Sequence, residues 1–326
     1  MNQEKILNFF GLLLIMFGVS FAIPLLVAVF YEESLVAVFG SGMSLLIALG
    51  FLSWFLTKDN EQELSLSDGF VITVLFWIVL SVSGSIPFIL FGFSVVDSFF
   101  ESMSGITTTG ATVFAGLDGL PKSLLIYRQL LQWLGGMGLI VLAIAVMPLL
   151  GIGGGQLFKT QTPGPMSEQR LTPRITSTAR ALWSIYLALT VLCVLAYRFA
   201  GMNYFDAVSH AFSTVSIGGF STHDLSIGYF DSLSIEIVCI VFMLLSAMSF
   251  AVHYSALYRK QVLKYFYDPE LRFFISLLIV ILSLVCLSLI SSNIEDPVRN
   301  GIFQTVSILT TTGFLTEEYS SWPTYV

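Results

Sequence analysis

Charged residues are scarce in this sequence. Only 11% of its 326 residues are Asp, Glu, Lys or Arg, and 56% are hydrophobic. Ordinary soluble domains carry about a quarter charged residues, and a soluble fold could not bury this much apolar surface. The composition therefore predicts a protein that sits in a lipid bilayer. Its net charge of −7 also argues against a nucleic-acid-binding protein, which would present a basic surface.

Cysteine is equally rare, and its placement excludes two further classes. The three cysteines, Cys193, Cys239 and Cys286, each lie within an apolar segment, and the sequence has no CxxC pair. Neither a disulfide framework nor a cysteine metal site is expected. We interpret the three thiols as small packing residues.

The sequence places no cluster of potentially catalytic side chains at one depth within the membrane. His, Asp and Cys form no cluster of the kind that an integral membrane enzyme needs, so no enzyme activity and no cofactor are predicted. We expect His210, His223 and His253 to pack or to form hydrogen bonds rather than bind metal. An ion-coupled transporter would need a buried acid within a span, but only Glu236 comes close, near an outer helix end.

Long apolar runs, in contrast, are abundant. Seven segments are long enough to cross a bilayer: about 6–30, 35–57, 70–91, 122–150, 179–200, 234–257 and 271–290. The fold class predicted is all-α, a polytopic membrane protein with about seven transmembrane helices and three re-entrant pore half-helices. Ser67 or Asp68 is placed to cap the third span.

The half-helices are predicted from a segment that occurs three times. Its copies are DSFFESMSGITTTGATV (97–113), DAVSHAFSTVSIGGFST (206–222) and NGIFQTVSILTTTGFLT (300–316). Aligned without gaps, all three have a serine at the same place and a glycine six residues later. These residues are Ser104, Ser213 and Ser307, then Gly110, Gly219 and Gly313. Each copy follows an apolar span, so the repeating unit is a span, a half-helix and a glycine turn.

Such turns point to ion conduction. A half-helix crosses only part of the bilayer, and irregular backbone at that depth must be buried in protein or line a wet cavity. Its carbonyl oxygens can replace the hydration shell of a monovalent cation, and glycine permits the positive φ that aims them. Re-entrant helices without an ion are the alternative, but three copies in phase favour permeation. The predicted filter residues are Thr107, Thr108, Thr109, Gly110, Ser216, Ile217, Gly218, Gly219, Thr310, Thr311, Thr312 and Gly313.

Within this filter, the ion contacts are predicted at Thr108, Thr109, Ile217, Gly218, Thr311 and Thr312. The threonine hydroxyls of the first and third copies either support the turn or ligate ions, and both roles stay open. At the start of each copy stands Asp97, Asp206 or Asn300. We expect these three residues to be helix N-caps rather than attractors of cations.

Basic residues set the orientation. With the N-terminus placed in the cytoplasm, most of the 14 Lys and Arg residues fall on the inner side, as the positive-inside rule requires. The outer side receives only Lys122, Arg128, Arg198 and Arg299. All three repeated segments then enter from the outer face. Acidic residues are more numerous on that face, where they either attract cations or are merely solvated.

Five stretches stand out around the repeats. They are TTTGA (107–111), SIGGF (216–220), TTTGF (310–314), QWLGGMG (132–138) and GGFSTHD (218–224). They resemble the Trk/Ktr/HKT potassium-transport superfamily over nearly the whole chain. The two leading spans and the TPGP…LTPR loop (162–174) make the chain most similar to bacterial Trk membrane subunits of the TrkH type.

The resemblance implies K⁺ uptake across the bacterial inner membrane, with K⁺ as the transported ion. It also implies four span–loop–span repeats around one pore, a homodimer, and a cytosolic nucleotide-binding regulatory subunit of the TrkA type. Glycine at position 110 implies preference for K⁺ over Na⁺. A channel-like pore is favoured, and a K⁺/H⁺ or K⁺/Na⁺ symporter is the alternative.

The chain departs from the family pattern because it stops after the third pore loop. We expect a fragment of a longer protein, which would not conduct selectively alone. The repeats divide it into 1–68 with two leading spans, 69–155 with the first repeat, 156–264 with a cytoplasmic loop and the second repeat, and 265–326 with an incomplete third repeat.

Overall fold

The computed structural model describes residues 2–58, 65–150, 175–292, 296–317 and 322–323. In these ranges every regular element is a helix, which confirms the predicted all-α class. The chain forms two compact units. The first unit contains Met1–Thr107 and Ala111–Gln156, and the second contains Thr108–Gly110 and Leu157–Val326. The loop at 162–174 lies outside the described residues.

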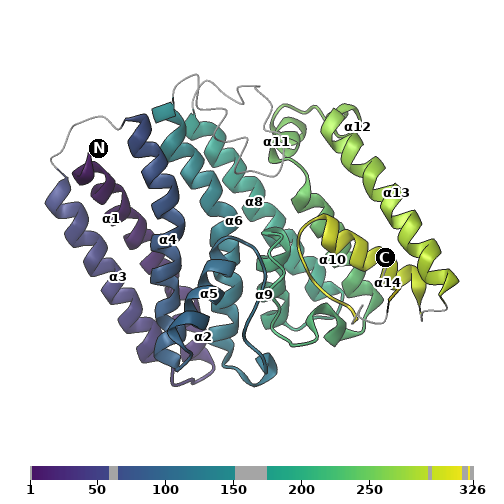
Figure 1. Cartoon of the computed structure of the whole chain (residues 1–326), viewed down its shortest axis with the longest axis horizontal. Helices are drawn as coiled ribbons and strands as arrows, with labels where there is room; N and C mark the ends of the chain where they lie inside the picture. Colours follow the sequence, from purple (N-terminus) through teal and green to yellow (C-terminus); the bar gives the residue numbers. More distant parts are fainter. Residues whose placement is uncertain (1, 59–64, 151–174, 293–295, 318–321, 324–326) are drawn as a thin grey trace. The chain divides into compact units, whose positions relative to one another are not determined.

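The first unit holds the leading helices and the first repeat (Figure 1). Its elements are α1 (Gln3–Ser20), α2 (Ala22–Phe30), α3 (Val36–Thr57), α4 (Leu66–Phe91), α5 (Val95–Ile106), the short 3₁₀ helix η1 (Leu117–Gly119) and α6 (Lys122–Leu150).

The second unit holds the second and third repeats. Its elements are α8 (Ile175–Phe199), α9 (Tyr204–Val215), η3 (Ser226–Phe230), α10 (Leu233–Ala247), α11 (Phe250–Tyr258), α12 (Lys264–Tyr267), α13 (Pro269–Ser291) and α14 (Pro297–Leu309).

Helices occupy all seven segments that the sequence marks as spans. Within the described residues, five helices are long and apolar enough to cross a membrane, and a bent pair would make a sixth. The exposed side chains on these helices are largely Leu, Val, Ile and Phe. Such surfaces suit a lipid environment, because lipid tails are as apolar as leucine.

The leading helices pack tightly through small residues. A Cβ added to Gly11 of α1 would lie 2.8 Å from the Gly50 carbonyl oxygen of α3. Only glycine lets the two backbones approach so closely. The loop between α2 and α3 then reaches the first repeat, where the Glu33 carboxylate accepts from the Lys122 and Ser123 amides at 2.6 and 3.1 Å. A carboxylate at the start of α6 satisfies amides that the helix leaves free.

An aromatic cluster forms the centre of the first unit. The Tyr127 ring of α6 contacts Phe21, Phe39 and Phe88 edge-on or tilted, with ring centroids 5.2 to 5.4 Å apart. All four side chains are fully buried. The Tyr127 hydroxyl donates to the Gly84 carbonyl at 2.8 Å, so its polar end is satisfied inside the protein. The cluster joins the leading helices to both spans of the first repeat.

The cap of the third span differs from the prediction. Ser65, rather than Ser67 or Asp68, is the N-cap of α4, and its hydroxyl accepts from the Asp68 amide. The Asp68 carboxylate returns a bond by accepting from the Ser65 amide at 2.9 Å. This reciprocal pair is a capping box, in which the acidic residue stands three positions after the cap.

The sixth predicted span is not continuous. The helix breaks after Ala247, and α10 and α11 meet at 90°. His253 bridges the break, because one ring nitrogen bonds the Leu245 carbonyl at 2.8 Å and the other bonds the Tyr265 hydroxyl at 2.7 Å. A carbonyl freed by a helix break needs such a partner inside an apolar environment.

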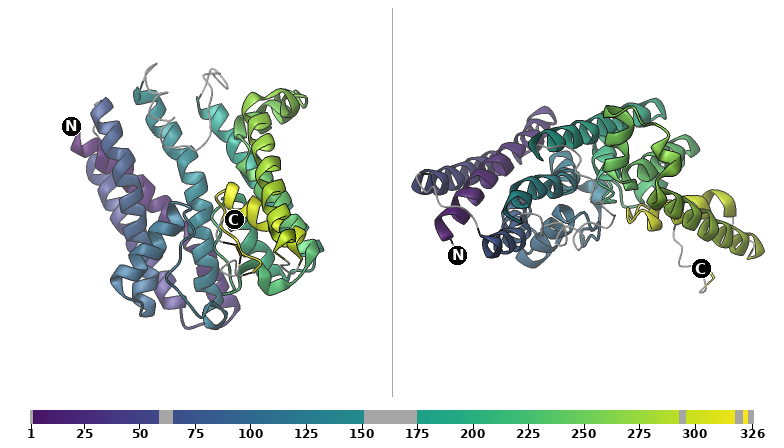
Figure 2. Two further views of the ribbon diagram at one scale, coloured as in Figure 1. Left: turned by 45° about the vertical axis from the view of Figure 1, so that its right-hand side comes forward. Right: turned by 90° about the horizontal axis from the view of Figure 1, so that it is seen from above.

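The three half-helices share one arrangement, which positions the turns discussed below. Each packs against the span before it, so α5 contacts α4, α9 contacts α8 and α14 contacts α13. Figure 2 shows the last pair at the yellow end of the colour scale. α10 also contacts both α9 and α14, so it joins the second and third repeats within the second unit.

Candidate ion filter

Each half-helix begins with a side-chain cap or a proline, and not where the sequence predicted. Ser94 and Asn203 are the N-caps of α5 and α9, and they accept from the amides of Asp97 and Asp206 at 3.1 and 2.9 Å. The predicted caps Asp97 and Asp206 therefore stand three residues inside the helices. Asn300 is also inside α14, which begins at Pro297. The acidic residues instead complete capping arrangements and complement the helix dipole.

The turn after each half-helix has the same backbone conformation. Gly110, Gly219 and Gly313 have φ of 79°, 79° and 82°, which confirms the predicted need for glycine. The residue two positions earlier is also left-handed although it is not glycine. These residues are Thr108, Ile217 and Thr311, with φ of 54°, 49° and 61°. A β-branched residue rarely adopts this conformation, and here three such residues adopt it at the same position of the repeated turn.

Hydrogen bonds hold the turns against their half-helices. The Gly218 amide donates to the Ser213 carbonyl at 2.8 Å, and the Thr312 amide donates to the Ser307 carbonyl at 2.9 Å. The repeated serine noted in the sequence thus supplies a backbone acceptor. These bonds connect each of the two turns to the last part of its half-helix.

The three turns lie side by side within the second unit. A Cβ added to Gly110 would collide with the Gly218 carbonyl oxygen and lie 3.6 Å from the Thr312 oxygen. A Cβ added to Gly219 would collide with the Thr312 carbonyl. Carbonyl oxygens of successive turns therefore gather at the glycines. A Cβ added to Gly313 would have no described atom within 4 Å.

Three of the threonine hydroxyls, those of Thr107, Thr310 and Thr312, bond the protein itself. Thr107 donates to the Met103 carbonyl at 2.7 Å, and Thr310 donates to the Val306 carbonyl at 2.8 Å. The hydroxyls of Thr310 and Thr312 are also 2.9 Å apart. Of the two roles that the sequence left open, these contacts favour support of the turn over ligation of ions.

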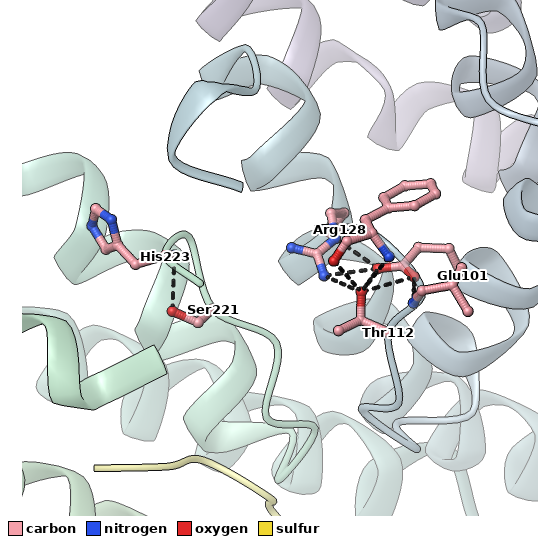
Figure 3. Close-up of polar contacts among 7 residues, drawn as sticks. Glu101, Thr112, Arg128, Ser221 and His223 are labelled. Carbon is pink, nitrogen blue, oxygen red and sulfur yellow. Dashed lines mark hydrogen bonds and ion pairs between the residues drawn. The ribbon is translucent and has the colours of Figure 1, made fainter. Parts of the chain in front are cut away.

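Behind the first turn lies a buried ion pair (Figure 3). The Glu101 carboxylate of α5 accepts from Arg128 Nε of α6 at 2.8 Å, and both side chains are fully buried. The same carboxylate accepts from the Thr112 hydroxyl at 2.9 Å and from the Val113 amide at 3.1 Å. Arg128 also donates to the Thr112 hydroxyl at 3.0 Å. A buried charge requires this kind of complete pairing.

Behind the second turn the support is built around His210 and Asp206. One ring nitrogen of His210 bonds the Ser221 hydroxyl at 3.0 Å, and the other bonds the Asp206 carbonyl at 2.9 Å. Asp206 accepts from the Thr222 hydroxyl at 2.8 Å, and His223 Nε2 lies 3.4 Å from its carboxylate. The predicted hydrogen-bonding roles of both histidines are confirmed. Within the described residues, no group of three or more His, Cys, Asp or Glu could hold a metal ion.

The third turn is held mainly from Glu317. Its carboxylate accepts from the Asn300 amide nitrogen at 2.7 Å and from Trp322 Nε1 at 2.9 Å. Its carbonyl accepts from Gln304 at 3.4 Å, a weak contact. The Ser307 hydroxyl donates to the Phe314 carbonyl at 2.7 Å, directly after the filter glycine.

A second arginine ties α14 to α10. Arg299 donates to both carboxylate oxygens of Glu236 at 2.9 and 2.7 Å and to Asp231 at 3.1 Å. Fork-like pairing of this kind fixes geometry as well as charge. The third half-helix is therefore anchored to the second repeat near its N-terminal end.

Residues 36–326 match the model of the TrkH family, which is described as a cation transport protein. The chain belongs to this family. It is 47% identical to the Trk system potassium uptake protein TrkH of Halomonas elongata and 43% identical to that of Escherichia coli K12. The alignments cover 99% and 100% of this chain, and 68% and 69% of those relatives.

A solved member of the TrkH family has the same fold. The crystal structure of the potassium transporter TrkH from Vibrio parahaemolyticus superposes with a TM-score of 0.89 at 45% identity. The match covers 100% of this chain and 68% of that one. The predicted resemblance to this family is thereby confirmed.

Sequence reasoning missed the support behind the first turn. It counted Arg128 simply as one of the outer basic residues and gave Glu101 no role, whereas the structure buries both. A signal was present: an arginine within an apolar span and a glutamate within an apolar half-helix both require a partner. The three cysteines are buried, as predicted.

Proposed function

We propose that the full-length protein takes up K⁺ across the bacterial cytoplasmic membrane, in a channel-like manner, through a selectivity filter. The filter comprises 107–110, 216–219 and 310–313, with ion contacts at the backbone of residues 108–109, 217–218 and 311–312. The observation that carries this proposal is the placement of the Gly218 and Thr312 carbonyls against Gly110 and Gly219. Carbonyl oxygens gathered in this way can replace the hydration shell of K⁺. The relatives' names as potassium uptake proteins support the choice of ion.

Channel-like permeation is favoured over ion-coupled symport by the ion pairs of two buried acids, Glu101 and Glu236. A carboxylate that couples transport must gain and lose a proton or an ion during the cycle. Glu101 is instead paired with Arg128, and Glu236 is paired with Arg299. Both carboxylates are therefore engaged in ion pairs within the protein, which leaves neither of them open to a coupling ion.

Reversal potentials test this proposal. The full-length protein in planar bilayers should give a reversal potential that follows the K⁺ gradient and hardly responds to a Na⁺ gradient. A potential that follows Na⁺ equally would contradict K⁺ selectivity. A shift with pH at fixed K⁺ would instead favour coupling to protons.

The proposal extends to the protein's oligomeric state and its regulatory partner. We propose a homodimer that is gated by a cytosolic nucleotide-binding subunit of the TrkA type, with the N-terminus in the cytoplasm. The word "system" in the relatives' names supports a further component, and the predicted charge bias supports the orientation. Light scattering of the detergent-solubilised protein should give the mass of a dimer. Nucleotide added to the co-reconstituted subunit should change the open probability, and a monomer or a nucleotide-independent channel would contradict this part.

A further inference from the structure

The segment that leaves the first turn is held by a side chain of its own half-helix. Thr112 and Val113 stand two and three residues after Gly110. The Thr112 hydroxyl and the Val113 amide both donate to the Glu101 carboxylate. The Thr112 hydroxyl donates to this carboxylate and accepts from Arg128 at 3.0 Å and from the Phe114 amide at 3.1 Å. One donor and two lone pairs are thus all used. These bonds tie the segment that follows Gly110 to the half-helix that precedes it.

The same contact recurs in the second repeat with different chemistry. Glu101 and His210 each stand four residues after the start of their copy, and Thr112 and Ser221 each stand two residues after the filter glycine. The side chains at these matching positions meet in both repeats, at 2.9 and 3.0 Å. A contact that persists while its residue types change indicates that its position is what matters. Figure 3 shows the charged version around Arg128 and places Ser221 beside His223.

We propose that Glu101, held in place by Arg128, is a positioning residue for ion selectivity, and that His210 has the same task in the second repeat. Glu101 does not touch the ion. Glu101 fixes the segment of chain that follows the filter, and it thereby limits how far the carbonyls of residues 107–110 can move. A filter that can relax accepts ions of another size, because selectivity depends on the number and placement of carbonyl dipoles. This inference rests on the proposed function.

Thr112→Val is the most specific test, because it removes the shared hydroxyl and leaves the ion pair between Glu101 and Arg128 in place. In the full-length protein we expect the K⁺/Na⁺ permeability ratio to fall by about tenfold, the equivalent of one lost buried hydrogen bond. Ser221→Ala should lower the ratio similarly through the second repeat. Thr112→Ser keeps the hydroxyl and should restore the ratio of the parent.

Thr73→Val is the matched control. Thr73 is a buried threonine of α4 whose hydroxyl donates to the Gly69 carbonyl of its own helix at 2.9 Å. Its replacement should leave the permeability ratio unchanged. Melting temperatures of all variants show whether a changed ratio merely reflects damaged folding. If Thr112→Val does not fold, Ser221→Ala carries the test.

Two failures are distinguishable. If the parent protein shows no preference for K⁺, the proposed function is wrong. If the parent selects K⁺ but Thr112→Val and Ser221→Ala both keep its ratio within about twofold, the positioning role is wrong, because that change lies well below the loss of one hydrogen bond.

Discussion

The first and second pore loops reach the same turn by different means. In the first, the support comes from two helices, since Glu101 lies on α5 and Arg128 on α6. In the second, the hydrogen bonds of His210 and Asp206 join the half-helix to the loop that follows it. Yet Gly110 and Gly219, the repeated glycines of the two loops, both have φ of 79°.

This difference separates what the proposed filter would require from what it would tolerate. The backbone conformation repeats, as expected for a filter in which ion binding depends on the placement of carbonyls. The supporting side chains vary, because an ion pair or a neutral hydrogen bond can hold a segment equally well if every polar group is satisfied. Removing the two kinds of support should lower the stability of the protein by different amounts. An unpaired buried charge destabilises the folded state more than an unpaired hydroxyl does.

Breaking what the loops share should have the largest effect. Gly219→Ala places a methyl group against the Thr312 carbonyl at a left-handed φ, so we expect loss of K⁺ selectivity in reversal-potential measurements. Gly116→Ala is the control: its φ is 72°, but no described atom lies within 4 Å of the new Cβ. It should cost only the backbone strain, roughly 1 to 3 kcal/mol, and keep selectivity. Retained selectivity in Gly219→Ala would remove this glycine from the filter.

Removing the charge from the first loop should be the next largest effect. Glu101→Gln leaves Arg128 buried without a charged partner, so unfolding free energy should fall by roughly 3 to 5 kcal/mol. Thermal melting of the detergent-solubilised protein measures this loss. The double variant Glu101→Gln with Arg128→Met should recover much of it, because no buried charge then remains. A single variant as stable as the parent would show that the pair is not isolated from water.

Removing the neutral support from the second loop should cost less. His210→Phe keeps the ring but loses the bonds to Ser221 and to the Asp206 carbonyl, which predicts a loss of roughly 1 to 3 kcal/mol. The same melting experiment compares it with Glu101→Gln. If the histidine variant proves the more damaging of the two, the comparison of charged and neutral support fails.

Replacing the N-cap residues of the half-helices should lower stability the least, and by the same amount in both loops. Ser94→Ala and Asn203→Ala each remove one side-chain acceptor at the start of a half-helix, so each should lower stability by about 1 kcal/mol. Neither should change selectivity, since both caps lie at the opposite end of the helix from the turn. Unequal losses would indicate that one half-helix depends more on its start than the other.

The sequence was sufficient for features that depend on local pattern. Apolar length predicted the positions of the spans, and the glycine repeat predicted the positive φ at Gly110, Gly219 and Gly313. It failed where a choice depended on neighbours. The N-caps were misplaced by three residues in two half-helices, because a capping arrangement contains two suitable polar residues and only the backbone decides between them. The break after Ala247 was also missed, since α10 and α11 are both apolar.

By itself, then, the sequence determined a helical membrane protein with three phased half-helices, because composition and repetition are properties of the chain alone. Only the tertiary structure decided that Gly110 lies against the Gly218 carbonyl and that Glu101 bonds both Arg128 and Thr112. These residues are remote in sequence or carry no motif. Their contacts arise from the requirement that every polar group buried away from water finds a partner.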